Sequence, residues 1–194
     1  MALTVDLETG RTAFADSVTA FVRAVDAFDE WDLLGASRCH GWTRLDVAVH
    51  VTAGWQEMLG GFVSPVEGPP TVDAASYWPA FDEEYADPDP VVPLMAQRRR
   101  SATYLRPDFA RRQLRDVAGA VLRGAASCSE GHFSWQGHVF TAGDFLAIWA
   151  VEDVIHQVDL LGEEPVPESA LALARATVAE LGGSSLTGRV PGAD

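Results

Sequence analysis

The sequence contains no lysine, and all 14 of its basic residues are arginine. Acidic residues number 28, so the 194-residue chain has a formal net charge of −14. Nucleic acids and anionic membranes are bound by basic surfaces, and this balance therefore argues against both as partners. An absence of lysine beside abundant alanine, glycine and aspartate is typical of a GC-rich genome.

Cysteine and long apolar runs are also scarce. Cys39 and Cys128 are far apart and form no CxxC pattern, so we expect no disulfide framework and a reducing compartment. No apolar run approaches the roughly 18 residues of a membrane span, and the N-terminal segment lacks the basic and apolar regions of a signal peptide. We therefore expect a soluble, cytoplasmic protein.

The apolar residues, 47% of the chain, are enough for a sizeable core and recur mostly at helical spacing. We expect one domain over residues 1–183 and a flexible tail over 184–194. The domain is predicted to contain a short β-ribbon over 132–140 and helices over 12–31, 43–62, 90–105, 108–127, 142–162 and 167–181. The predicted fold class is all-α, an up-and-down four-helix bundle with a long crossover loop and an extra C-terminal helix.

The predicted crossover, residues 63–93, is rich in proline, glycine and acidic residues. A solvated acidic loop is the simpler interpretation. The alternative is a lid that walls a pocket with four aromatic side chains: Tyr77, Trp78, Phe81 and Tyr85. Arginine clusters at 98–100 and 111–112 are interpreted as solvated faces paired with acids, with an anchor for an anionic substrate group as the alternative.

The segment around Glu152 and His156 carries the clearest sign of chemistry. These two residues are four apart, so they share one face of a helix. Phe145 and Trp149 extend that face, and a face with large aromatic residues is normally buried. A buried carboxylate is costly unless it is paired or binds a metal. A surface ion pair is the simpler interpretation, and a metal site is the sharper one.

His50 lies on the inward side of the helix predicted over 43–62. A lone histidine on an apolar face is more often a hydrogen-bonded core residue than a ligand. An inward histidine on a second helix nevertheless strengthens the metal interpretation of Glu152 and His156. We therefore predict that His50, Glu152 and His156 bind one divalent metal.

Two imidazoles and one carboxylate suit Zn²⁺ with an open fourth position, and Fe²⁺, Ni²⁺ and Mn²⁺ are alternatives. Asp159 is the predicted catalytic residue, as an acceptor that orients a ligating imidazole, although it could also be an exposed residue of the last turn. Zinc with one carboxylate carries a net charge of +1, which hydroxide or a thiolate would neutralise. Because a metal lowers the pKa of a bound thiol, this site could supply a thiolate nucleophile.

Two segments carry a family resemblance. GWTRLDVAVHV, at 41–51, and EDVIHQVDL, at 152–160, together resemble the DinB-like superfamily, and most of all its mycothiol-dependent maleylpyruvate isomerase branch. The resemblance covers roughly residues 12–183. It implies a four-helix bundle that binds a divalent metal, usually zinc, through His50, Glu152 and His156. It also implies mycothiol, the low-molecular-weight thiol of GC-rich actinobacteria, as a cosubstrate.

The isomerase proper has a C-terminal domain that supplies a catalytic arginine, for which we expect no counterpart here. The leading prediction is therefore an enzyme that acts as a thiol S-transferase, in which mycothiol thiolate on the metal attacks a small electrophile. Four tryptophans are predicted to wall the cosubstrate pocket, with the core as the alternative for each: Trp42, Trp55, Trp78 and Trp149. The protein would be a monomer or a homodimer.

Two other functions remain open from the sequence. A thiol-independent lyase, hydrolase or isomerase would use the metal to activate water or polarise a carbonyl, with Asp159, His132 or His138 as the additional acid or base. A non-catalytic metal-binding module would close the fourth metal position with a protein ligand, for which His132, His138 and Cys128 are the candidates.

Overall fold

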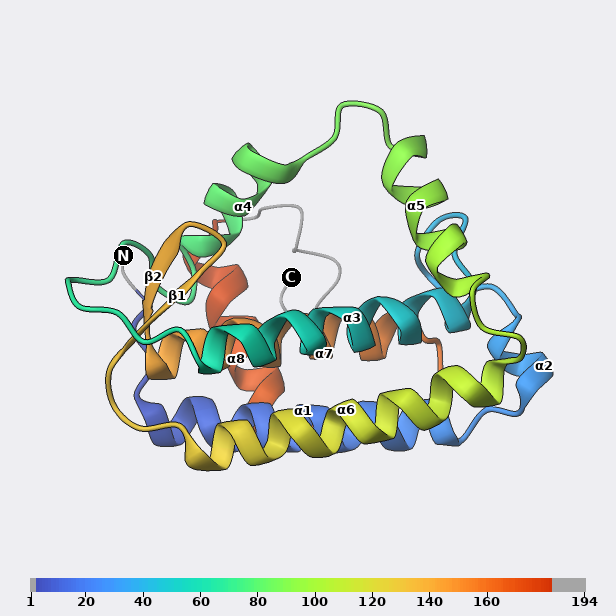
Figure 1. Ribbon diagram of the computed structural model, residues 1–194, viewed down its shortest axis with the longest axis horizontal. Helices are drawn as coiled ribbons and strands as arrows, with labels where there is room; N and C mark the ends of the chain where they lie inside the picture. Colours follow the sequence, from blue (N-terminus) through green and yellow to red (C-terminus); the bar gives the residue numbers. More distant parts are fainter. Residues whose placement is uncertain (1–2, 183–194) are drawn as a thin grey trace.

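The computed structural model describes residues 3–182 as a bundle of long helices with a small β-hairpin at one end (Figure 1). The elements in order are α1 (Leu7–Asp26), α2 (Glu30–Leu33), α3 (Arg44–Phe62), α4 (Tyr77–Tyr85), α5 (Val91–Ser101), α6 (Pro107–Ser127), β1 (His132–Trp135), β2 (His138–Thr141), α7 (Ala142–Asp159) and α8 (Glu168–Glu180). The tail predicted over 184–194 lies outside the described residues.

The four longest helices, α1, α3, α6 and α7, form the bundle, and α8 packs against α1 and α7. Helix α7 is the most enclosed of them, because its residues are buried on nearly every side. It contacts α1, α3 and α8 and the hairpin. The predicted all-α bundle with an extra C-terminal helix is therefore confirmed, and its central helix is the one that carries Glu152 and His156.

The boundaries of the helices follow from capping side chains. Helix α1 begins well before the predicted residue 12, because the Asp6 carboxylate accepts a hydrogen bond from the backbone N–H of Thr9. The segment predicted as one helix over 12–31 is in fact broken, and Asp29 caps the separate short helix α2. Helix α3 begins at the predicted place, where Thr43 and Asp46 form a capping box.

The prediction of an irregular crossover over 63–93 is wrong in part, because α4 lies within it. Tyr77 opens this helix and is buried, with its ring 5.7 Å from the ring of Trp135. Pro79 is in the first turn, where its missing N–H costs nothing. The simpler interpretation, a solvated acidic loop, does not hold for this helix, whereas the alternative of aromatic pocket walls agrees with Tyr77, Trp78 and Phe81, which line a cavity.

Helices α1 and α7 approach each other closely because glycines meet at their contact. A Cβ atom added to Gly10 would lie 2.6 Å from the carbonyl oxygen of Gly143, and one added to Gly143 would lie 2.0 Å from the carbonyl oxygen of Val5. Any side chain would push the two backbones apart. This contact sets how deeply α7 sits in the bundle.

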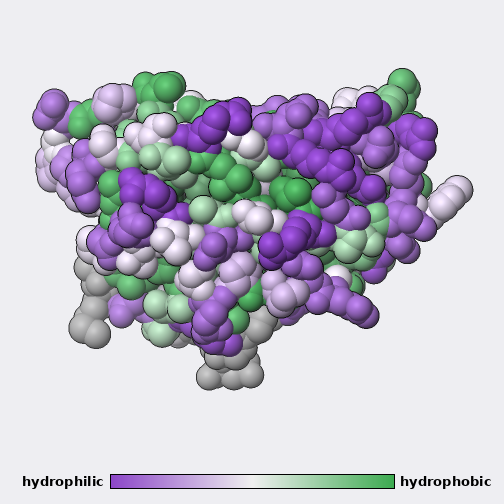
Figure 2. All heavy atoms as spheres, turned by 90° about the horizontal axis from the view of Figure 1, so that it is seen from below, coloured by the Kyte–Doolittle hydropathy of each residue, from purple (hydrophilic) through white to green (hydrophobic). Residues whose placement is uncertain are grey.

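The surface agrees with the composition. Hydrophilic residues cover most of the face seen from below, and hydrophobic residues show between them in smaller areas (Figure 2).

Within residues 3–182, no helix is both long enough and apolar enough to cross a membrane. Both cysteines, Cys39 and Cys128, are free thiols, as predicted.

Candidate functional site

Helices α3 and α7 bring the three predicted metal ligands together. Glu152 Oε1 lies 2.9 Å from His156 Nε2 and 3.4 Å from His50 Nε2. The two imidazole ring centroids are 4.7 Å apart. One ligand atom from each of the three side chains lies within 4.8 Å of the others, so the group could hold one cation.

The donor set and its spacing fit a divalent metal. Two imidazole nitrogens and a carboxylate oxygen are typical zinc ligands, with bonds of roughly 2.0–2.2 Å. Two such atoms on one tetrahedral ion are about 3.4 Å apart, which is close to the separation of Glu152 Oε1 from His50 Nε2. Only a small movement of His156 would be needed for its Nε2 to reach the same spacing from Glu152.

Pairing among the three side chains opposes the effect of burial on their pKa values. Burial by itself would lower the pKa of His156, but the adjacent Glu152 carboxylate raises it well above its usual value, with help from Asp159 and Cys39. Burial would likewise raise the pKa of Glu152, and the two histidines instead hold it well below its usual value. Burial lowers the pKa of His50, against the opposing effect of Glu152. The carboxylate is therefore ionised and ready to bind a cation.

Asp159 lies on the other side of His156, away from Glu152. Its Oδ2 atom is 3.2 Å from His156 Nδ1 and accepts a hydrogen bond from Cys39 Sγ at 3.1 Å. Only 1% of Asp159 is exposed, so it is not the surface residue that the alternative interpretation required. Because the pKa of His156 is raised, both of its ring nitrogens carry protons in the metal-free chain, with Nδ1 donating to Asp159 and Nε2 to Glu152, and a cation at the site would replace the Nε2 proton.

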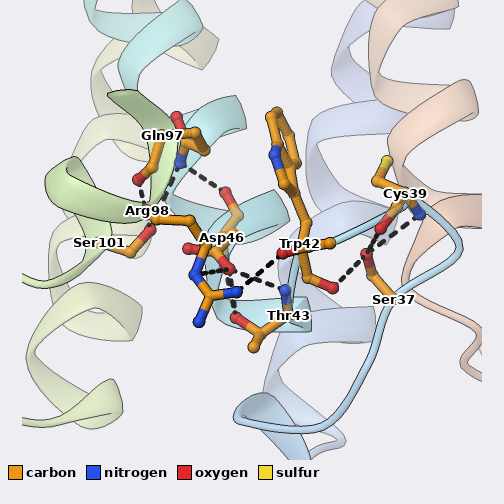
Figure 3. Close-up of polar contacts among 9 residues, drawn as sticks. Ser37, Cys39, Trp42, Thr43, Asp46, Gln97, Arg98 and Ser101 are labelled. Carbon is orange, nitrogen blue, oxygen red and sulfur yellow. Dashed lines mark hydrogen bonds and ion pairs between the residues drawn. The ribbon is translucent and has the colours of Figure 1, made fainter. Parts of the chain in front are cut away.

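The loop that precedes α3 is fastened to α5 (Figure 3). Gln97 Nε2 donates to the backbone oxygen of Asp46 at 2.8 Å, and Arg98 Nη1 donates to the backbone oxygen of Gly41 at 2.8 Å. Trp42 lies between Gly41 and Asp46 in the sequence, and its ring centroid is 5.2 Å from that of His50. The GWT segment therefore places an aromatic ring beside a ligand-type histidine.

Two cavities border the site, and His50 and Glu152 line both of them. The smaller, which we call the aromatic cavity, has a volume of about 130 Å³, and its apolar walls are Tyr77, Trp78, Phe81, Trp135, Ile148 and Trp149. The larger, which we call the open cavity, has a volume of about 760 Å³ and is lined by Cys39, His40, Trp42, Leu94 and His156, among others. Trp78 and Phe81 separate the two cavities, because both residues line each of them.

Three of the four tryptophans predicted to wall a pocket line one or both cavities. Trp42 lines the open cavity, Trp149 the aromatic cavity and Trp78 both. The prediction for Trp55 is wrong: its side chain is fully buried and donates from Nε1 to Asp153 at 2.9 Å. Trp55 is five residues after His50, which turns it about 140° away from that histidine around the helix.

Other residues at the site were not identified from the sequence. Trp135 and Gln136 reach the aromatic cavity from the tip of the hairpin, where Gln136 and Gly137 both have positive φ angles of 47° and 75°. That pair is a two-residue turn signal, and it predicts a hairpin without predicting what the hairpin covers. Arg100 of α5, which belongs to the cluster whose alternative interpretation was a substrate anchor, also lines this cavity.

The closed metal site of the non-catalytic alternative is not formed by the residues suggested for it. Among residues 3–182, the groups that could hold a metal contain neither Cys128 nor His132 nor His138. Cys128 and His132 line a separate cavity, together with Phe62 and Pro65.

Comparison with known proteins identifies a family and a shared fold. The family model described as "Mycothiol maleylpyruvate isomerase N-terminal domain" matches residues 13–161. Two crystal structures have the same fold: the mycothiol-dependent maleylpyruvate isomerase, and a mutant of it with one histidine replaced by alanine. Each is 20% identical in sequence, has a TM-score of 0.62, and covers 90% of this chain and 70% of its own. No curated protein matches significantly.

Proposed function

Because the chain belongs to the family of mycothiol maleylpyruvate isomerase N-terminal domains, we propose that it is a metal-dependent thiol S-transferase. It would join mycothiol to a small electrophile. The family match supports an enzyme of the mycothiol-dependent isomerase or transferase kind. The specific transfer reaction is our proposal, and it rests mainly on one observation: a metal-type donor set lies at the junction of two cavities.

His50, Glu152 and His156 would hold the cation, and zinc suits this donor set best, with iron, nickel and manganese as alternatives. A divalent cation there would lower the pKa of a bound thiol and so supply a thiolate at neutral pH. Asp159 would accept the Nδ1 proton of His156 and thereby orient its Nε2 atom toward the cation. Asp159 therefore acts as a positioning residue.

The size of the open cavity supports its use by a large thiol such as mycothiol. It is lined by polar and aromatic side chains, including His40 and Trp42, and it reaches both His50 and His156. Mycothiol would occupy it with the sulfur next to the three ligands. The thiol proton would leave to solvent through the same opening.

The transfer forms one sulfur–carbon bond. In a substitution, the electrophilic carbon releases a leaving group with its electron pair. In an addition, the conjugated double bond opens and the neighbouring carbon takes up a proton. The aromatic and apolar walls near Glu152 would keep water away from the reacting atoms.

The test combines metal analysis with product detection. Metal-loaded protein is incubated with mycothiol and a panel of an epoxide, an alkyl halide and an enone, and conjugates are identified by mass spectrometry. We expect one metal ion per chain and conjugate formation above the uncatalysed rate. His50→Ala should lose both, because His50 would be a ligand and is only half-buried, so that its removal leaves the core intact.

The matched control is His132→Ala, which removes a histidine from a hairpin strand that borders a different cavity. It should keep both the metal and the activity. Full metal occupancy in His50→Ala would refute the ligand assignment. Turnover of a substrate without any thiol would instead favour the thiol-independent lyase or hydrolase.

A further inference from the structure

The proposed function assigns the thiol to the open cavity and leaves the aromatic cavity without a ligand. The ring of Trp135 lies 5.0 Å from that of Trp149 and 5.7 Å from that of Tyr77, and Ile148 completes an apolar surface. The volume is about 130 Å³. An apolar protein cavity of roughly 150 Å³ holds one benzene ring, so this space suits a single ring.

The charged groups around this cavity favour a neutral ligand. Glu152 is paired with His156, and the other two charged groups that line the cavity, the Glu57 carboxylate and the Arg100 guanidinium, offset each other, so the cavity presents no net charge to a ligand. The chain as a whole carries a net charge of −14. Gln136 also lines the cavity; its Oε1 accepts a hydrogen bond from the Tyr77 hydroxyl at 3.1 Å, which leaves its NH₂ group to donate to an uncharged oxygen.

The two cavities meet at the same two ligand-type side chains, His50 and Glu152. A thiol in the open cavity and a second molecule in the aromatic cavity would therefore approach each other there. We propose that the aromatic cavity binds the electrophilic substrate, and that this substrate is a neutral carbonyl compound with one apolar ring. The role as substrate rests on the proposed function, whereas binding of the ring does not.

Gly54 sets the size of this cavity. It lies one helical turn after His50 on α3 and lines the cavity wall. A Cβ atom at this position would be 2.9 Å from Cζ3 of Trp149. A methyl group would therefore either push the indole ring into the space or occupy the space itself. One additional methyl group in a well-fitted apolar pocket changes affinity by about tenfold or more.

The experiment measures binding without metal, thiol or turnover. The probe is acetophenone, a neutral ring with a carbonyl group, and the contrasting probe is maleate, an acyclic dicarboxylate. Protein labelled with ¹⁵N at the tryptophan indoles is titrated by NMR, and the signals of Trp135 and Trp149 are assigned from Trp→Phe variants. We expect saturable shifts of these two signals with acetophenone and weaker binding of maleate.

Two variants test the location. Gly54→Ala should weaken acetophenone binding by about tenfold or more, while Gly60→Ala should leave it unchanged, because nothing lies within 4 Å of a Cβ at Gly60 in the same helix. Phe81→Leu, at a half-buried wall position of α4, should weaken binding without disturbing the core. Circular dichroism verifies that each variant is folded.

The proposal is overturned if acetophenone does not bind, if maleate binds as tightly, or if both Gly54→Ala and Phe81→Leu bind like the wild type. These results are independent of the proposed S-transfer. If acetophenone binds as expected and no mycothiol conjugate ever forms, the cavity assignment stands and the transferase assignment falls. Conjugates formed without any preference for ring compounds would overturn the role of the cavity as the substrate site, while the transferase assignment would stand.

Discussion

At the scale of single residues, the pKa of Asp153 is raised whereas that of its neighbour Glu152 is lowered. Its Oδ1 atom accepts from Trp55 Nε1 at 2.9 Å, and its Oδ2 atom lies 2.7 Å from Ser17 Oγ. Ser17 Oγ also donates to the backbone oxygen of Phe14 at 2.9 Å. Because a hydroxyl has only one hydrogen, all three contacts are satisfied when Asp153 itself is protonated and donates to Ser17. Burial raises the pKa of Asp153 to about 8, which agrees with this assignment.

This pKa predicts how stability changes with pH. An unfolded aspartate has a pKa of about 3.9, so between roughly pH 4 and pH 8 the unfolded chain releases a proton that the folded chain keeps. The contribution of Asp153 to stability is thus complete below about pH 4 and is lost as the pH rises to 8, by at most about 1.4 kcal/mol per pH unit. Asp153→Asn keeps both hydrogen bonds and cannot ionise. We expect the variant to gain stability relative to the wild type at pH 8.

Urea unfolding of the metal-free protein at pH 5 and pH 8 measures the difference. Asp116→Asn, the same change at an exposed position of α6, serves as the control, and its free energy of unfolding should change with pH as that of the wild type does. If the free energy of unfolding of Asp153→Asn changes with pH as much as that of the control, Asp153 ionises normally in the folded chain.

At the scale of secondary-structure elements, the position of α7 depends on its contact with α1. Gly143 faces the backbone oxygen atoms of Val5 and Asp6, which cannot turn aside as a flexible side chain could. Gly143→Ala should therefore reduce the free energy of unfolding by about 3 kcal/mol or more, at the upper end of the cost of overpacking. Gly60→Ala, in an open stretch of α3, should increase it by about 0.5–1 kcal/mol, because alanine is the better helix former.

Thermal and urea unfolding of both variants measure these opposite effects. A Gly143→Ala protein as stable as the wild type would mean that α1 and α7 can separate without loss, and the close contact would then not fix the depth of α7.

The elements also show how far the sequence could predict the structure. The long helices followed from their apolar spacing, and the starts predicted at residues 43 and 142 agree with those of α3 and α7, which Thr43 and Thr141 cap. His50, Glu152 and His156 could be grouped because each lay on the inward face of its helix. Trp135 could not be added to the site, and Arg100 could be offered only as an alternative, because the hairpin and α5 reach the site only through tertiary packing. Periodicity describes the faces of a helix and says nothing about which distant loop will cover them.

At the scale of the whole molecule, the excess of acidic residues opposes compactness. The chain carries 28 acidic and 14 basic residues. The ion pairs, such as Arg115 with Asp26, lie mostly at exposed positions, and each contributes at most about 1 kcal/mol. The long-range repulsion among the remaining negative charges is not cancelled by them.

Salt should therefore stabilise the metal-free protein. Raising NaCl from about 10 mM to about 150 mM shortens the screening length from roughly 30 Å to roughly 8 Å, so repulsion across the molecule weakens. We expect Tm to rise, and a gain of about 1 kcal/mol would raise it by roughly 2–4 °C for a chain of this size. Scanning calorimetry with a chelator present measures the change.

The internal control is the same comparison near pH 4.6, the isoelectric point, where the net charge vanishes and the salt effect should disappear. A fall in Tm with salt at pH 7 would mean that the ion pairs outweigh the repulsion.

The placement of the tryptophans gives the molecule an optical property. Of its six indoles, those of Trp42, Trp78, Trp135 and Trp149 border the two cavities, while Trp31 is 82% exposed on α2. Four of the six emitting side chains therefore border the cavities, and we expect Trp31 and the buried Trp55 to add a background that ligands do not change. Occupancy of either cavity by a molecule that absorbs in the near ultraviolet would dim the emission of those four side chains, so the protein can report on its own ligands.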